Sequence, residues 1–184
     1  MTLSNAGLDL IKSFEGCRLT AYQDSAGVWT IGYGHTKGVK RGQVITEAQA
    51  EEFLREDVTC AVAAVIGLSR DLTQGEFDGL VSFTFNCGPK NLHKLCDGRT
   101  MDQIKEKILL YNKAGGTVLT GLMRRRRAEL QLMTGAAPDI ALDLRKDFQR
   151  FLNSHDAGLA VDGIIGPKTK NAWNYYKNKA GILI

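Results

Sequence analysis

The stretch "FEGCRLTAYQDSAGVWTIGYGHT", residues 14–36, contains the change of pattern that decides the fold of the chain. Before it, apolar residues recur at helical spacing, and Gly16 is a typical helix stop, so Glu15 is expected in the last turn of a helix. Over residues 19–34 apolar residues alternate with others around the turn signal at 24–27. We therefore predict a helix that leads directly into a small β-hairpin.

Helical patterns dominate the rest of the chain. Two Thr residues, each followed three positions later by Gln or Glu, form capping boxes before apolar segments: Thr46 with Gln49, and Thr73 with Glu76. Residues 100–116 and 120–135 read as two further helices, the first ended by Gly115 and Gly116. The predicted fold class is α+β and mostly helical.

The stretch "MTGAAPDIA", residues 133–141, combines Gly, small residues and Pro138 between two helical patterns, and we predict a linker at residues 136–139. We therefore predict two domains, residues 1–135 and 140–184. The second has a helix–loop–helix pattern around "VDGIIGPKTK", residues 161–170.

The composition is that of a globular protein, with 184 residues, 43% hydrophobic and 24% charged. The N-terminus has no basic start followed by an apolar run, and no apolar stretch is long enough to cross a bilayer, so we expect a soluble chain made in a cytosol. The net charge of +4 favours an anionic partner, for which both nucleic acid and bacterial cell wall qualify.

The four cysteines do not predict a metal site. They lie far apart without paired ligand spacing, and only three histidines are available: the cysteines are Cys17, Cys60, Cys87 and Cys96. We expect reduced thiols, with a later disulfide still open in an oxidising compartment, and no cofactor.

Three polar residues of the opening stretch could form a reaction centre. Taken singly, Glu15, Asp24 and Thr30 have ordinary explanations as a helix end, a turn residue and a strand threonine. Together, the two carboxyls meet the need of acetal cleavage for a proton donor and a second carboxylate across the bond. Apolar neighbours such as Phe14 would keep Glu15 protonated near neutrality, whereas Asp24 on a polar turn would stay ionised.

The same residues carry a family resemblance. "FEG", nine positions from Glu15 to Asp24, six more to Thr30, and then "IGYGHT" are similar to the signature of glycoside hydrolase family 24, the phage lysozymes. "LVSFTFNCG" (80–88) and "YNKAGGTVLTGLMRRRRAE" (111–129) extend the resemblance. It implies an inverting hydrolase of the β-1,4 bond between N-acetylmuramic acid and N-acetylglucosamine. Glu15 would be the general acid, Asp24 would position or deprotonate water, and Thr30 would help hold that water.

Four further residues are candidates for substrate binding. A single histidine without a clustered partner, His35, is more often a hydrogen-bonded structural residue than a base or ligand. Gly34 would let the backbone approach a sugar closely. Tyr22 and Phe85 would line the groove, with core packing as the alternative for each.

The arginine run 124–127 raises the question of nucleic-acid binding. Four consecutive helical residues fan around the axis, so they form no single basic strip. We expect a solvated face with an ion pair to Glu129, and no nucleic-acid partner, because aromatic residues do not alternate with the basic ones.

The C-terminal segment resembles the small three-helix peptidoglycan-binding domain. The matching residues are Gln149, Leu152, Asp162, Gly163, Gly166, Pro167 and Thr169. These residues would build the loop whether or not it binds anything, and the ending "YYK" departs from the family's apolar residue and Gln. The candidates for wall contact are Asp162, Trp173 and Tyr175, since aromatic rings can stack on sugars.

The sequence thus predicts a phage endolysin, a monomer that degrades peptidoglycan. The enzyme would accumulate in the host bacterial cytoplasm and act in the periplasm or cell wall once a holin opens the membrane, without stable membrane insertion. The alternatives are an injected or secreted antibacterial muramidase effector, a non-catalytic wall-binding protein and a basic membrane-active protein. A lytic transglycosylase is a further chemical alternative. Asp24 argues against it, because such enzymes usually lack a second carboxylate.

Overall fold

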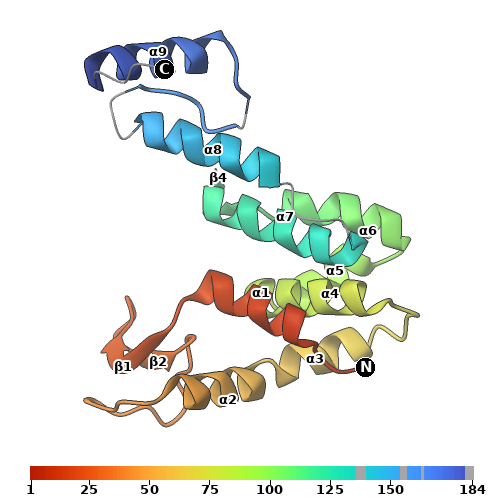
Figure 1. Cartoon of the computed structure of the whole chain (residues 1–184). Helices are drawn as coiled ribbons and strands as arrows, with labels where there is room; N and C mark the ends of the chain where they lie inside the picture. Colours follow the sequence, from red (N-terminus) through yellow and green to blue (C-terminus); the bar gives the residue numbers. More distant parts are fainter. Residues whose placement is uncertain (136–139, 154–156, 163, 181–184) are drawn as a thin grey trace. The chain divides into compact units, whose positions relative to one another are not determined.

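The computed structural model describes residues 1–135, 140–153, 157–162 and 164–180 (Figure 1). The chain divides into two compact units, unit 1 at Met1–Ala136 and unit 2 at Ala137–Ile184. The predicted linker, residues 136–139, and the loop glycine Gly163 lie outside the described residues.

Unit 1 is mostly helical, with two short antiparallel hairpins. Its elements in chain order are α1 (Asn5–Glu15), β1 (Arg18–Gln23), β2 (Trp29–Gly32), α2 (Glu47–Asp57), α3 (Thr59–Ile66), α4 (Gln74–Cys87), α5 (Pro89–Cys96), α6 (Met101–Lys107), the 3-10 turn η1 (Ile108–Leu110), β3 (Lys113–Ala114), β4 (Thr117–Val118) and α7 (Thr120–Thr134). The predicted α+β class, mostly helical with a small hairpin, is confirmed.

Helix α1 has defined caps at both ends. The Ser4 hydroxyl accepts a hydrogen bond from the Gly7 amide, and Gly16, at φ +70°, donates its amide to the Lys12 carbonyl. A positive φ is accessible to glycine without strain, so Gly16 ends the helix. The predicted position of Glu15 in the last turn is confirmed.

Both predicted capping boxes are present. Thr46 with Gln49 begins α2, and Thr73 with Glu76 begins α4. The helical pattern behind Thr46 is divided between α2 and α3, which meet at Val58.

The prediction of one helix over residues 100–116 is wrong. Helix α6 ends at Lys107, and the chain then forms η1 and the hairpin of β3 and β4. Gly115 and Gly116, at φ +56° and +81°, form the tight turn of that hairpin instead of ending a helix. Helix α5, which begins with Pro89 in its first turn, was not predicted.

Helix α4 is the centre of unit 1 and is buried along most of its length. It packs against α1, α3, α5 and α7. Gly75 and Gly79 permit the approach to α7, because a Cβ at either would collide with Leu132 or Met133. The main core includes Leu8 and Ile11 of α1, and a smaller core of Ile31, Ile45 and Ala50 lies under the first hairpin.

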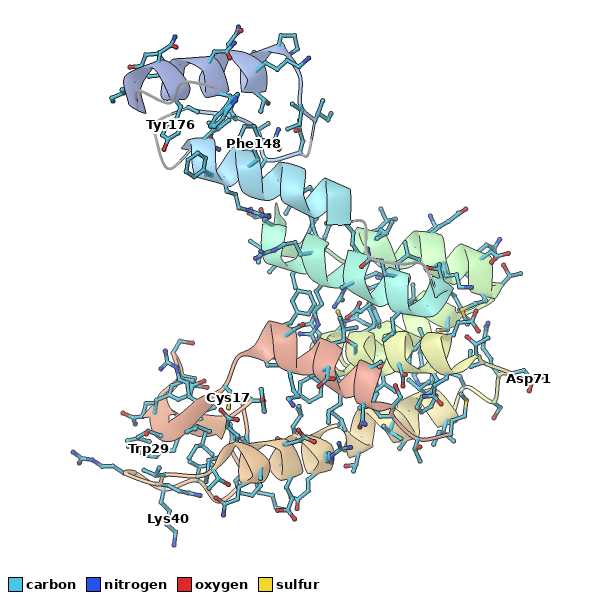
Figure 2. All side chains as sticks on the ribbon, in the orientation of Figure 1. Cys17, Trp29, Lys40, Asp71, Phe148 and Tyr176 are labelled. Carbon is cyan, nitrogen blue, oxygen red and sulfur yellow. The ribbon has the colours of Figure 1, made fainter. Side chains whose placement is uncertain are left out.

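Unit 2 consists, in the part that is described, of α8 (Ile140–Asn153) and α9 (Pro167–Ala180) joined by a loop. A third helix, which the resemblance implied, is not among the described residues. Ring contacts join the two helices: Phe148 meets Trp173 with centroids 5.4 Å apart, and Phe151 meets Tyr176 at 5.0 Å. Figure 2 labels Phe148 and Tyr176, two members of this cluster.

Among the described residues, no helix combines the length and the apolar character needed to cross a membrane.

Candidate active site

Glu15 projects from the last turn of α1 and is held by an arginine from a distant part of the chain. Its Oε1 accepts a hydrogen bond from Nη1 of Arg125 on α7, at 2.6 Å. The Glu15 side chain is 27% exposed, whereas that of Arg125 is 4% exposed. The carboxyl therefore faces solvent on one side and a buried guanidinium on the other.

Arg125 is itself fixed from several directions. Its Nε lies 3.3 Å from Oε1 of Glu129, and its Nη2 donates to the Ser82 carbonyl at 3.4 Å. Its guanidinium carbon lies 5.6 Å from the ring centroid of Phe14. The sequence predicted apolar surroundings for Glu15, and the structure adds this cation to them.

Behind Arg125 lies a fully buried ionic pair. Nε of Arg126 is 2.8 Å from Oε2 of Glu129, and Nη2 of Arg126 donates to Oε1 at 2.9 Å. The Ser82 hydroxyl also donates to Oε1 at 2.9 Å. Burial raises the pKa of Glu129 to about 7, although the Arg126 charge, the Ser82 hydrogen bond and Arg125 act in the opposite direction.

The prediction of a solvated face for the arginine run is therefore wrong for two of its four members. Arg125 and Arg126 are buried, while Arg124 and Arg127 are more exposed. Four consecutive residues point in different directions around the helix, and the middle two face α4. There Ser82 hydrogen-bonds to both Arg125 and Glu129. The predicted ion pair with Glu129 is confirmed.

Asp24 occupies the turn of the first hairpin and is bonded only to that turn. Its Oδ1 accepts hydrogen bonds from the amides of Ala26 and Val28, both at 2.9 Å. Its own amide donates to the Val28 carbonyl at 3.0 Å. Within the described part of the chain, Oδ2 has no hydrogen-bond partner, so one carboxylate oxygen is fixed and the other is open to solvent.

Thr30 lies next to this turn on β2 and is 4% exposed. Its hydroxyl donates to the Val28 carbonyl at 3.1 Å. The Asp24 carboxylate is hydrogen-bonded to the amide of Val28, so both side chains are anchored to the backbone of the same residue. Across the hairpin, Thr30 pairs with Tyr22, and the neighbouring Trp29 pairs with Gln23. Figure 2 labels Trp29.

The sequence comparison over this region identifies the family. Residues 12–129 match the phage lysozyme family. The chain belongs to the phage lysozyme family. The matched range includes Glu15, Asp24, Thr30 and the Arg125 network, and it lies within unit 1.

Individual relatives agree with this membership. The endolysin of Acyrthosiphon pisum secondary endosymbiont phage 1 is 40% identical over 74% of this chain and 100% of its own length. The endolysin of Bacillus phage B103 is 38% identical over 84% of this chain, which spans 63% of that relative. The chain thus spans less than two thirds of the Bacillus phage B103 endolysin.

Solved structures of similar proteins share the fold. The endolysin from Escherichia coli O157:H7 phage FAHEc1 has a TM-score of 0.66 at 40% identity, covering 74% of this chain and 96% of that one. The muramidase domain of SpmX from Asticaccaulis excentricus has a TM-score of 0.65 at 38% identity, covering 74% and 99%. The predicted lysozyme-like fold is confirmed.

In this phage lysozyme family member, His35 is bonded on both sides of its ring. Nδ1 lies 2.9 Å from Oδ2 of Asp57, and Nε2 lies 2.9 Å from the Lys37 carbonyl. The ring is buried and stacks on Phe53 with centroids 4.4 Å apart. Both nitrogens are engaged within the protein, as a structural histidine requires.

The other predicted substrate-binding residues have mixed surroundings. Tyr22 is half-buried, with the Arg18 guanidinium 4.3 Å from its ring centroid. Gly34 is exposed at φ +98°, and a Cβ placed on it would meet no atom within 4 Å. Phe85 packs against the main core. Of these, Gly34 has the most open surroundings.

The predicted wall-contact residues of unit 2 differ in accessibility. Asp162 accepts hydrogen bonds from Nε2 of Gln149 and the amide of Ile164, both at 2.8 Å. Trp173 is half-buried between Phe148 and Tyr176. Tyr175, in contrast, is 66% exposed. The first two therefore make contacts within the unit itself, Asp162 through loop hydrogen bonds and Trp173 in the aromatic cluster.

Neither the thiols nor the acidic residues suggest a metal centre. All four cysteines are free, and within the described ranges no cluster of three or more His, Cys, Asp or Glu is placed to hold a metal ion.

Sequence reasoning did not assign a site role to Arg125. The residue was visible in the run "RRRR", but adjacent cations are usually solvated, and only the three-dimensional contact of α7 with the end of α1 selects this one. The signal available in the sequence was the acidic Glu129 four positions later on the same helix.

Proposed function

We propose that this chain is an endolysin that hydrolyses the β-1,4 bond between N-acetylmuramic acid and N-acetylglucosamine in bacterial peptidoglycan. The observation that carries the proposal is the family-matched pair of carboxyls, Glu15 held by Arg125 at a helix end and Asp24 on the adjoining hairpin turn. Acetal hydrolysis needs two such groups, one to protonate the leaving oxygen and one to activate water.

Glu15 acts as the general acid. Its protonated carboxyl gives a proton to the oxygen of the leaving sugar, and the carboxylate that remains pairs with the Arg125 guanidinium. Arg125 is a positioning residue, because its own contacts to Glu129 and Ser82 fix the direction from which it holds Oε1.

Asp24 acts as the general base of an inverting reaction. The two backbone amides hold Oδ1, so the open Oδ2 is the atom that accepts the proton of the attacking water. The Thr30 hydroxyl donates to Val28, which leaves its oxygen lone pairs to accept a hydrogen bond from the same water. Water then attacks the sugar from the face opposite the leaving oxygen.

The substrate lies outside the cell membrane, so the enzyme has to reach it. Described residues contain no membrane-spanning helix. We propose synthesis in the host cytoplasm, release through a membrane opened by a holin, and action as a monomer on the wall. The competing proposal is release without a holin. It is suggested by a relative named SAR-endolysin, from Haemophilus phage HP1, which is 29% identical to this chain.

Unit 2 is proposed to bind the wall. In this proposal residues 1–135 are the muramidase domain, 140–184 the peptidoglycan-binding domain and 136–139 the linker. The loop around Asp162 and the pattern of apolar residues on α8 and α9 support it. The family match does not extend to this unit, so its function needs its own test.

Mass spectrometry of digested, purified peptidoglycan tests the catalytic proposal. We expect muropeptides that end in reducing N-acetylmuramic acid, whereas an anhydro end, lighter by one water, would indicate a transglycosylase. The Glu15→Gln variant should fold normally by circular dichroism and lose roughly 10²- to 10⁴-fold of the rate. Near-normal turnover by the folded variant would contradict the assignment of Glu15.

A further inference from the structure

Helix α9 has an unusual distribution of charge. Its 14 residues, "PKTKNAWNYYKNKA", contain four lysines and three asparagines, and no aspartate or glutamate. A helix with that composition carries a positive charge that none of its own residues compensates.

One side of α9 packs against the rest of unit 2. Thr169 is 3% exposed and donates to the Ile164 carbonyl at 3.3 Å. Trp173 and Tyr176 stack with ring centroids 5.7 Å apart and meet the aromatic residues of α8. These three positions, at spacings of three and four, define the inner face of the helix.

The opposite side is polar and exposed. At 100° per residue, Asn171, Asn174 and Asn178 fall within one stripe, with Tyr175 beside them. Lys168 and Lys179 lie along one edge of this stripe, and Lys170 lies along the other. The outer face of α9 is defined here by the exposed residues Lys168, Lys170, Asn171, Asn174, Tyr175, Asn178 and Lys179.

The side chains of the outer face are not used inside the protein. Within the described residues of the chain, none of the seven makes a side-chain hydrogen bond, ion pair or ring contact, and Tyr175 is 66% exposed. Asp162 and Trp173, in contrast, are engaged in the loop and the aromatic cluster. Among the described residues of unit 2, the outer face of α9 thus offers a set of exposed polar side chains that the protein itself does not use.

We propose that the outer face of α9 binds the glycan strand of peptidoglycan, an inference that rests on the proposed function of unit 2. Amide side chains both donate and accept, which matches the hydroxyl and acetamido groups of amino sugars. The Tyr175 ring offers a flat surface for the apolar face of a sugar ring. The lysines at the edges complement the carboxylates that the muramic acid residues and their peptides carry.

The chemistry of the face favours a glycan over other anionic polymers. It contains no arginine, the residue best suited to bidentate phosphate contacts. Apart from Tyr175 it contains no apolar side chain that could enter a lipid layer, as an interfacial helix requires. An amide-rich stripe with a single exposed ring corresponds to a sugar ligand.

The test measures binding of the 184-residue chain to purified sacculi from which teichoic acids and proteins have been removed. Every protein carries Glu15→Gln so that the sacculi stay intact, and the amount sedimenting with them is followed at constant salt. We expect Tyr175→Ala to raise the dissociation constant about fivefold to tenfold. Tyr175→Phe should retain binding because it keeps the ring.

Charge is tested with matched pairs. One double variant removes two charges from the outer face of α9, by Lys168→Ala and Lys170→Ala. The control double variant removes two exposed charges from α5 in unit 1, by Lys90→Ala and Lys94→Ala. We expect the α9 pair to weaken sedimentation several-fold more than the α5 pair. Equal effects would show that only net charge matters and would overturn the inference.

Two further outcomes would also overturn it. One is unchanged binding by Tyr175→Ala. The other is a loss of binding by the α9 variants that appears only with walls containing teichoic acid or with phosphatidylglycerol vesicles. That result would show that the outer face of α9 binds a phosphate ligand. If unit 2 does not bind walls at all, the parent still sediments through the substrate site of unit 1, but residues 137–184 produced alone do not sediment. Failure of this inference alone leaves that fragment bound to sacculi and its Tyr175→Ala variant bound equally.

Activity separates the face from the catalytic site. In chains that keep Glu15, the α9 variants should hydrolyse short soluble wall fragments at the rate of the unmodified chain, because the substitutions lie outside unit 1. A loss on soluble fragments would show that these variants disturb more than wall binding and would contradict the inference.

Discussion

Two turns of this protein are closed by an aspartate in nearly the same way, yet their surroundings differ. In the first hairpin, Oδ1 of Asp24 accepts from the amides two and four residues later. In the loop before α9, Oδ1 of Asp162 accepts from the amide of Ile164, two residues later, and also from the side chain of Gln149 on α8. Asp24 holds only its own turn, whereas Asp162 ties a loop to a helix.

The comparison shows where the rigid support of each region comes from. In unit 2 the aspartate is part of that support, together with the buried Gln149. In unit 1 the support lies behind the other carboxyl, in the ionic network of Arg125, Arg126 and Glu129. An aspartate in a turn is therefore not by itself the mark of a reaction centre, and its partners decide what it can do.

The same conservative change should reduce activity strongly in the first turn and leave it unchanged in the second, and this is the largest expected effect. Asp24→Asn keeps an oxygen to accept the two amides but removes the base, so hydrolysis should fall by roughly 10²- to 10⁴-fold with unchanged circular dichroism. Asp162→Asn should leave the hydrolysis of soluble fragments unchanged. Release of reducing ends measures both, and comparable rates for the two variants would erase the distinction between the turns.

The ionic network behind Glu15 should make the stability of unit 1 depend on pH. The pKa of Glu129 is raised from 4.5 to about 7, so the folded protein binds this proton more tightly than the unfolded chain. The resulting stabilisation is complete below pH 4.5 and is lost as the pH rises toward 7, by up to roughly 3 kcal/mol. Urea unfolding of the unmodified chain and of Glu129→Gln at several pH values measures the difference between them.

The difference in unfolding free energy, unmodified chain minus Glu129→Gln, should decrease between pH 4.5 and 7. A difference that stays constant or increases over this range would mean that Glu129 remains ionised throughout and that the two arginines outweigh its burial.

Loss of the helix-to-loop connection should destabilise unit 2 more modestly. Gln149→Ala removes hydrogen bonds to Asp162 and the Ile164 carbonyl, at 2.8 and 3.0 Å, and should lower the unfolding free energy of that unit by about 1–2 kcal/mol. Fluorescence of Trp173 in a Trp29→Phe background reports on unit 2, because the chain has two tryptophans. The exposed Asn178→Ala is the matched control, and equal midpoints for both would contradict the role of Gln149.

The smallest effect concerns acid. The hydrogen bond from Gln149, followed by the one from the Ile164 amide, lowers the pKa of Asp162 below its ordinary value of 3.8. A lowered pKa stabilises the fold above pH 3.8, and this contribution is lost as the pH falls below that value. The Trp173 signal of unit 2 should accordingly show a weaker acid dependence in Asp162→Asn, and an identical acid profile would show that the carboxylate adds nothing.

Local features of the fold could be predicted because local chemistry specifies them. Gly16 ends α1, the boxes at Thr46 and Thr73 begin helices, and alternation defines the first hairpin. The prediction that Gly115 and Gly116 end a helix is wrong, because they form the turn of a hairpin. Two glycines after a helical pattern are compatible with either structure.

The long-range part of the site could not be predicted in the same way. Arg125 lies 110 positions from Glu15, and whether one member of an arginine run is buried depends on which side of α7 meets α4. For the same reason the sequence did not show that Trp173, a predicted wall contact, is half-buried against Phe148 of α8. Such choices are made by packing between elements, which a linear pattern does not record.

The most direct test of the account is the configuration of the first product, followed by proton NMR of the anomeric signals during early turnover of a soluble peptidoglycan fragment. If Glu15 and Asp24 act as acid and base on opposite faces of the bond, water enters with inversion, and the β-linked substrate first gives the α-anomer, which later equilibrates. First appearance of the β-anomer would require retention and would contradict the role of Asp24 as the base that activates water.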